Sequence, residues 1–302
     1  MKPIVRQNRP IASERAKPRM AYEKSCAFSD GLPDHQCAKH VADTGSRTRH
    51  TNGRSSGSNI FCCTIDILPR YRQRMTSGSC GEVRTYFSHA ERMFPEIENG
   101  KVPTEQFLMA CQGIADFVGF LGTAFTPVKN DISGNVAKVR SKFESNKEKF
   151  KYLEDLIDDD LAQNGGKLGY ATEGLLWLKR GLEFMLELLT EMVREYRSSA
   201  DKNATESLVD IINKAYVATL KRHHGFVSKQ LFKVVIIAAP YRRTILKALA
   251  EGNEGIDDIC IDHIAAHLDN FRINVAHVVD YYVEKKLDTP NPTPTSLTQL
   301  KN

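Results

Sequence analysis

Hydrophobic residues recur every three or four positions from about residue 87 to residue 286, and the alternating pattern of a β-strand is missing there. In the stretch 103–121, for example, Phe107, Cys111 and Ile114 fall on one side of a helix. That period is typical of an amphipathic helix whose apolar stripe faces a core. The pattern therefore predicts an all-α fold.

Breaks in the periodicity divide this part of the chain into successive helices. Thr126 is a candidate N-cap for a helix whose first turn holds Pro127, and Asn146 is a candidate N-cap for the next one. No repeat or linker interrupts residues 86–290, so we predict one domain there. After the helix at 103–121, the predicted helices are 127–143, 146–161, 171–197, 206–224, 227–238, 241–251 and 257–286.

Two of the predicted helices, 171–197 and 227–238, are apolar around most of their circumference. A helix of this kind belongs at the centre of a fold. Two of them are more than a compact bundle of this size needs, which leaves room for an internal apolar compartment. A completely filled core is the alternative.

The positive charge of the chain is confined to its N-terminal part. Residues 1–85 carry fifteen Lys and Arg against seven Asp and Glu, whereas residues 86–302 carry 27 against 30. The N-terminal segment is rich in Ser, Gly and Arg and lacks a helical period, so we predict a disordered basic extension at 1–85. Three prolines within 290–294 predict a disordered tail at 291–302. Scattered arginines without an aromatic platform do not indicate a nucleic-acid partner.

Cysteines and histidines in the N-terminal segment raise the question of a zinc site. No regular CxxC pair occurs there, so a metal competes with free thiols, and we predict no metal and no cofactor. The chain also lacks an apolar run of about 18 residues and the apolar segment of a secretory signal, which favours a cytoplasmic protein. The cysteines concerned are Cys26, Cys37, Cys62, Cys63 and Cys80.

Three polar residues in the helix predicted at 127–143 are candidates for ligand recognition. Asp131, Asn135 and Lys138 follow at i, i+4 and i+7 and therefore share one helical face. A carboxylate accepts hydrogen bonds, an amide accepts and donates, and an ammonium donates, which suits a polyhydroxylated head group. Gly134 lies among them and lets a ligand approach the backbone, at a helix cost of about 1 kcal/mol. A solvated face with weak ion pairing is the alternative.

Several segments resemble the glycolipid transfer protein family in their order and spacing. Together they cover most of residues 86–290, and residues 1–85 lie outside the resemblance. The resemblance implies an all-α, two-layer helical sandwich that encloses an apolar compartment for the chains of a ceramide. The segments are Phe125-Thr-Pro-Val-Lys, Asp131-Ile-Ser-Gly-Asn-Val-Ala-Lys, Leu176-Trp-Leu-Lys-Arg-Gly-Leu, His223-His-Gly-Phe, Ala238-Ala-Pro-Tyr and Leu246-Lys-Ala-Leu.

The resemblance also implies a role for each candidate site residue. Asp131 would bind the ceramide amide N–H and a sugar hydroxyl, and Asn135 and Lys138 would hold further sugar hydroxyls. Trp177 would stack beneath the sugar ring, because the weakly positive sugar C–H groups suit the negative face of an indole. His224 would donate to the amide carbonyl, for which it must be neutral.

Two aromatic residues complete the implied site. Tyr241 is a candidate for an additional ligand contact. Phe226 stands where a Trp is typical of the family and is a candidate for docking on a membrane, although it lacks the indole N–H that favours the interface. We therefore expect a non-enzymatic, monomeric carrier of glycosphingolipids between membranes, with transient peripheral membrane contact.

The resemblance leaves alternatives open. The branch that carries ceramide 1-phosphate has a basic residue in place of Trp177, so the sugar-binding type fits better, but Lys138, Lys179 and Arg180 keep the phosphate type open. A lipid sensor or adaptor would share the fold and the binding but not the transfer.

An enzyme is the competing class of protein. Asp131 with His224 could form an acid–base pair, and the aspartates 158–160 suggest a metal cluster. No nucleophile motif or Gly-rich phosphate loop accompanies them. We expect the three consecutive aspartates to point in different directions and to be solvated, and we predict that the protein is not an enzyme.

Overall fold

The structure is a computed structural model, and it describes residues 83–292, 295 and 297. The predicted basic extension, apart from residues 83–85, and most of the predicted C-terminal tail lie outside the described residues, as do the five N-terminal cysteines. Within the described part, every regular element is helical, as the periodicity predicts. The α-helices are α1 (Thr104–Gly119), α2 (Thr126–Ser145), α3 (Leu153–Gln163), α4 (Tyr170–Ser198), α5 (Val209–Ala218), α6 (Phe226–Ile237), α7 (Arg242–Leu249) and α8 (Asp257–Glu284).

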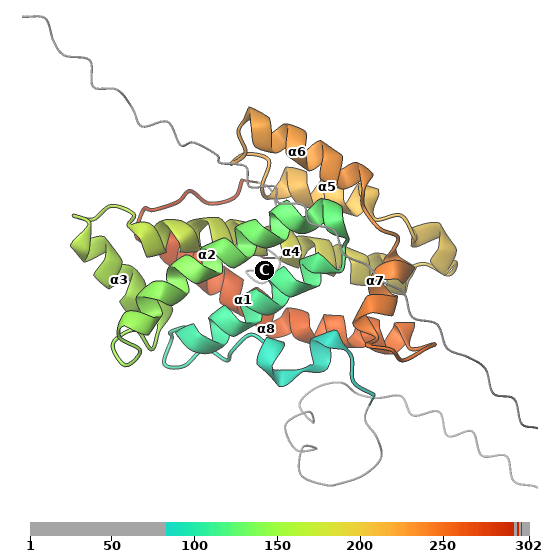
Figure 1. Cartoon of the computed structure of the whole chain (residues 1–302), viewed down its shortest axis with the longest axis horizontal. Helices are drawn as coiled ribbons and strands as arrows, with labels where there is room; N and C mark the ends of the chain where they lie inside the picture. The colour runs from blue at the N-terminus through green and yellow to red at the C-terminus, as the bar shows by residue number, and fades with distance from the viewer. Residues whose placement is uncertain (1–82, 293–294, 296, 298–302) are drawn as a thin grey trace, which may run out of the picture. The chain divides into compact units, whose positions relative to one another are not determined.

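The helices of residues 83–292 form two layers. Helices α1 and α2 pack side by side, α4 and α8 pack side by side, and α2 lies against α4. Figure 1 shows α1 and α2 in front of α4 and α8. Helix α5 packs on α4 and carries α6, while α7 packs on α8. The predicted two-layer helical sandwich is confirmed.

Of the two helices that are apolar on most sides, only α4 is central. It contacts both α2 and α8, and 17 of its 29 residues are buried. Helix α6 buries only Phe232 and Val235. The remaining apolar surface of α6 therefore faces away from the core.

Three predicted helix ends are wrong. Helix α2 begins at Thr126 without a side-chain cap, because the 3₁₀ turn 123–125 leads directly into it. Asn146 caps a turn instead of a helix, since its Oδ1 accepts from the backbone N–H of Lys149 at 3.0 Å, and α3 begins only at Leu153. Helix α5 ends at Ala218, and a series of turns then leads to α6.

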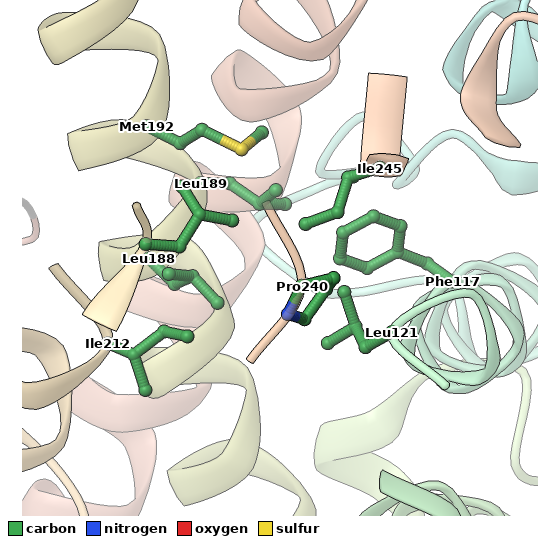
Figure 2. Close-up of a pocket in the computed structure, with 9 residues that line it drawn as sticks. Phe117, Leu121, Leu188, Leu189, Met192, Ile212, Pro240 and Ile245 are labelled. Atoms are coloured by element: carbon green, nitrogen blue, oxygen red, sulfur yellow. The ribbon is translucent and has the colours of Figure 1, made fainter. Parts of the chain in front are cut away.

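An apolar pocket lies between α1, α4, α5 and α7 (Figure 2). Its cavity volume is about 10 Å³, which is roughly the room that one water molecule occupies. Its own side chains therefore nearly fill the pocket. The lining residues are Phe117, Leu121, Leu188, Leu189, Met192, Leu208, Ile212, Pro240 and Ile245.

Candidate functional site

The three polar residues predicted to share a face of α2 form a hydrogen-bonded row. Asn135 Nδ2 donates to Asp131 Oδ2 at 3.5 Å, and Lys138 Nζ donates to Asn135 Oδ1 at 3.0 Å. Asn135 is buried, whereas Asp131 reaches the surface. The row therefore presents a carboxylate at its open end and holds the amide in a fixed orientation.

A glycine brings α4 close to this row. A methyl group placed on Gly174 would lie 2.9 Å from Cβ of Lys138 and 3.4 Å from the carbonyl oxygen of Asn135. Only a residue without Cβ permits this approach. Trp177 follows Gly174 by three residues and therefore lies on the same face of α4, where its ring is half-buried. Sequence reasoning missed Gly174, although a Gly within a helix of strong helix formers was the available signal.

One face of the Trp177 ring is covered by a cation. Cζ of Arg180 lies 4.9 Å from the ring centroid, within the range of a cation–π contact. Asp288, which follows α8, holds this guanidinium through Nη2–Oδ1 at 2.8 Å and Nε–Oδ2 at 3.2 Å. Burial acts to raise the pKa of Asp288, but hydrogen bonds from Arg180 and Lys179 outweigh it and hold the pKa far below its ordinary value.

His224 lies in the turns between α5 and α6, beside the open end of the row. Burial lowers the pKa of His224, and the nearby charge of Asp131 opposes this effect only in part, so the ring is neutral at neutral pH. Burial in turn raises the pKa of Asp131, while Lys138 and His224 act to lower it. Asp131 and His224 are thus close enough for the charge of one to shift the pKa of the other.

Tyr216 of α5 supports His224 and is a residue that sequence reasoning missed. Its hydroxyl lies 3.2 Å from Nδ1 of His224. Its ring stacks on Phe232 of α6, with 3.6 Å between the ring centroids. No motif marks Tyr216, because its partners belong to different elements.

Comparisons with known proteins identify the family to which this chain belongs. The family model for Glycolipid transfer protein (GLTP) matches residues 102–251. The glycolipid transfer protein of Danio rerio is 34% identical over 203 residues, which are 66% of this chain and 95% of that protein. The chain belongs to the glycolipid transfer protein family.

Other known proteins are similar to this chain in sequence or in fold. Human pleckstrin homology domain-containing family A member 8 is 37% identical over 175 residues, 55% of this chain and 31% of that protein. A solved structure concerned with how FAPP2 selects simple glycosphingolipids using the GLTP-fold has a TM-score of 0.60, 29% identity and coverage of 70% of this chain and 100% of that chain. Human ceramide-1-phosphate transfer protein, with bound ceramide 1-phosphate, shares the fold at a TM-score of 0.55 and 18% identity, covering 68% and 97%.

Two further candidate residues lie at the surface of this glycolipid transfer protein fold. Tyr241 precedes α7, and its exposed ring lies under the guanidinium of Arg243 at 5.3 Å. Phe226 is the first residue of α6, and 77% of it is exposed. The structure thus places Phe226 and Tyr241 at opposite ends of α6, outside the hydrogen-bonded row.

The consecutive aspartates of α3 have different main partners, although Asp159 and Asp160 both lie near Lys142. Asp158 pairs with Lys285 at 2.7 Å, and Asp159 pairs with two lysines. Asp160 accepts hydrogen bonds from the backbone N–H and the hydroxyl of Thr172, near the start of α4. The three carboxylates point in different directions, as expected, but the expected solvation is wrong for Asp160, which is buried. Among residues 83–292 no group of acidic residues, His or Cys is arranged to hold a metal ion.

Proposed function

We propose that this protein is a non-enzymatic carrier of glycosphingolipids between membranes. The observation that supports the proposal is the hydrogen-bonded row on α2, against which α4, the helix of Trp177, packs at Gly174, with Asp131 within electrostatic range of His224. No covalent bond changes in such a transfer, so the proposal requires neither a catalytic residue nor a metal or cofactor.

The site suits the amide and the sugar of a glycosylated ceramide. Asp131 would accept from the amide N–H and a sugar hydroxyl, and Asn135 and Lys138 would bind further hydroxyls. Trp177 would stack on the sugar ring with the face of the indole that Arg180 does not cover. A hydrogen bond between neutral groups is worth about 0.5–1.5 kcal/mol and one to a charged group about 1.5–3 kcal/mol, so several of them together can select a head group.

The two hydrocarbon chains would supply most of the binding free energy. About thirty methylenes leave water at about 0.8 kcal/mol each, or on the order of 20 kcal/mol in total. We propose that they enter the apolar pocket between α1, α4, α5 and α7 as its side chains move apart. Burial of the hydrocarbon chains would then supply the affinity for the lipid, and the polar row would supply the specificity for its head group.

Helix α6 is proposed as the surface that touches a membrane. At about 100° per residue its exposed apolar side chains fall within roughly 140° of the helical wheel, and we call them the docking face. Ile237 is 85% exposed, and Lys229 and Lys233 lie beside this face. An apolar face with flanking lysines suits the interface of a bilayer and needs no spanning segment. The docking face consists of Phe226, Val227, Leu231, Val234 and Ile237.

The carrier that we propose is cytoplasmic and monomeric, touches membranes transiently and has no nucleic-acid partner. None of the helices in residues 83–292 is long and apolar enough to cross a bilayer. Lys179 and Arg180 are both paired with Asp288, so Lys138 in the row is the remaining candidate cation for a phosphate, which favours a sugar over a phosphate. The ceramide 1-phosphate carrier is therefore the less favoured type.

Transfer between vesicles tests the proposal. Phosphatidylcholine donor vesicles would contain fluorescent glucosylceramide, ceramide 1-phosphate, ceramide or phosphatidylcholine, and we expect this protein to move glucosylceramide fastest. Transfer of ceramide 1-phosphate alone would assign the phosphate type, and binding of glucosylceramide without transfer would assign a sensor.

The docking face is tested with the same vesicles. The double substitution Phe226→Ser and Ile237→Ser should weaken vesicle association and slow transfer. Ile273→Ser is the matched control, because Ile273 is also an exposed apolar residue but lies on α8. An equal loss of vesicle association in the double variant and in Ile273→Ser would contradict docking through α6.

A further inference from the structure

Four charged side chains form a buried cluster beside Trp177. Asp288 accepts from Lys179 Nζ at 2.8 Å and from Arg180 Nη2 at 2.8 Å, and Lys179 also donates to Glu183 at 3.1 Å. The side chains of Lys179 and Asp288 are only 2% and 5% exposed. We call Lys179, Arg180, Glu183 and Asp288 the charge cluster.

The position of Asp288 is set from two directions. On one side it is held by α4 through the charge cluster. On the other side Arg222 donates to the carbonyl oxygens of Thr289 at 3.1 Å and Pro290 at 2.9 Å, and Asn291 donates to the carbonyl of Ala218 at 2.6 Å. The segment after α8 therefore crosses the same end of the molecule that carries Trp177 and His224.

The charge cluster contains two cations and two anions and has no net charge. Without Asp288 it would carry one surplus positive charge, next to the ring that faces the proposed sugar. A phosphate monoester carries about −1.5 to −2 charges at neutral pH and binds most strongly to guanidinium forks. Asp288 already occupies the fork of Arg180, so a phosphate at this place meets a neutralised cation and a buried carboxylate.

We propose that Asp288 determines the head-group specificity of this protein by excluding phosphate in favour of neutral sugars. The inference rests on the proposed function and deepens it. Asp288 acts through Arg180 and Trp177 and does not itself touch the lipid. The carboxylate holds the guanidinium against one face of the indole and cancels the charge that would attract a phosphate.

The test compares two lipids that differ only in the head group. Phosphatidylcholine vesicles would carry labelled glucosylceramide or ceramide 1-phosphate, and the ratio of the two transfer rates would be measured for the full chain. Asp288→Asn keeps the shape of the side chain and removes its charge. We expect the transfer rate of ceramide 1-phosphate, divided by that of glucosylceramide, to rise about tenfold in this variant. This is the effect of one additional charge-assisted hydrogen bond.

Two further variants separate specificity from stability. Asp159→Asn also removes a carboxylate that binds two lysines, but far along the chain at α3, and its ratio should equal that of the wild type. Lys179→Gln removes one positive charge and gives the charge cluster a net charge of −1, and it leaves Trp177 in place. The ratio of the ceramide 1-phosphate transfer rate to the glucosylceramide transfer rate should therefore fall. This second variant also tests the inference if Asp288→Asn fails to fold.

The outcomes distinguish the inference from the proposed function. An unchanged ratio in folded Asp288→Asn, or an unchanged or higher ratio in Lys179→Gln, would overturn the role of Asp288 and leave glycolipid transfer by the wild type intact. A wild type that transfers ceramide 1-phosphate in preference to glucosylceramide would overturn both.

Discussion

The hydroxyl of Tyr216 lies 3.2 Å from Nδ1 of His224 and connects α5 to the proposed head-group site. The tyrosine O–H can donate to Nδ1 of the neutral imidazole, which then carries its proton on Nε2. Since Tyr216 is itself stacked on Phe232, the ring of His224 is held in one orientation by an element outside the site. The tautomer that the site needs thus depends on the packing of α5 against α6.

Tyr216→Phe should lower glycolipid transfer about two- to tenfold, the effect of losing one hydrogen bond. The melting temperature should change little, because the stacked ring remains. Transfer assays and ¹⁵N NMR of the His224 ring nitrogens check both the rate and the tautomer. Tyr152→Phe, which removes a surface hydrogen bond to Glu98, is the control, and an equal effect of the two substitutions would exclude a role of Tyr216 in the site.

Asp131→Val should abolish transfer of glucosylceramide while leaving the helix content unchanged. Loss of two hydrogen bonds to a carboxylate, at about 1.5–3 kcal/mol each, lowers binding by at least two orders of magnitude. Trp177→Ala should also impair transfer, because the stacking surface is lost. Circular dichroism and vesicle transfer provide the measurements, with Asp116→Val as a control on α1. Retained transfer by Asp131→Val would refute the assigned head-group site.

Gly174→Ala and Gly181→Ala should have opposite effects on stability. A methyl at Gly174 meets Lys138 at 2.9 Å and must push α2 from α4, whereas a methyl at Gly181 meets nothing within 4 Å. Overpacking costs about 1–3 kcal/mol, while Gly to Ala in an open helical position contributes up to about 1 kcal/mol. Chemical denaturation would measure both changes, and transfer should fall only for Gly174→Ala. Equal stabilities of the two variants would show that α2 and α4 are not in close contact there.

His267 should make the fold less stable in acid. Burial lowers its pKa to about 3, and its ring nitrogens have no hydrogen-bond partner among the described residues. Below about pH 6.5 the unfolded chain binds a proton at this histidine and the folded chain does not, so the residue lowers the free energy of unfolding by about 1.6 kcal/mol between pH 6.5 and pH 5. His267→Phe should reduce this loss in denaturation experiments at the two pH values.

His277 provides a control of opposite sign for that experiment. The hydrogen bond that His277 donates to the Glu154 carboxylate raises the pKa of His277, so its contribution to stability is present below the unfolded pKa and is lost as the pH rises through the folded pKa. His277→Gln should therefore lower the stability at pH 5 more than at pH 8. A similar pH profile for both variants would contradict these assignments.

Local features of this protein could be predicted from the order of its residues. The row of Asp131, Asn135 and Lys138 depends only on the geometry of one helix, and the family segments identified the fold around it. The N-caps at Thr126 and Asn146 were wrong, because a preceding 3₁₀ turn and a competing turn decide where these helices begin.

Contacts between distant segments could not be predicted in the same way. Gly174, Tyr216 and Asp288 carry no local signal that names their partners, since each acts across a helix crossing or a chain end. Lys179 and Arg180 kept a phosphate ligand open in the sequence, and only the fold shows that both pair with Asp288 and that Glu183 supplies the second negative charge.

The sequence by itself determined the helical period, the central place of α4, the family and the polar row, because these depend on short-range spacing and on residue chemistry. Only the tertiary structure decided that α6 exposes its apolar side chains while α4 buries them, because burial depends on what packs against a face. The tertiary structure likewise decided that Lys179 and Arg180 are paired. Their partner Asp288 lies more than one hundred positions away in the sequence, so only the fold determines the distances between these charges.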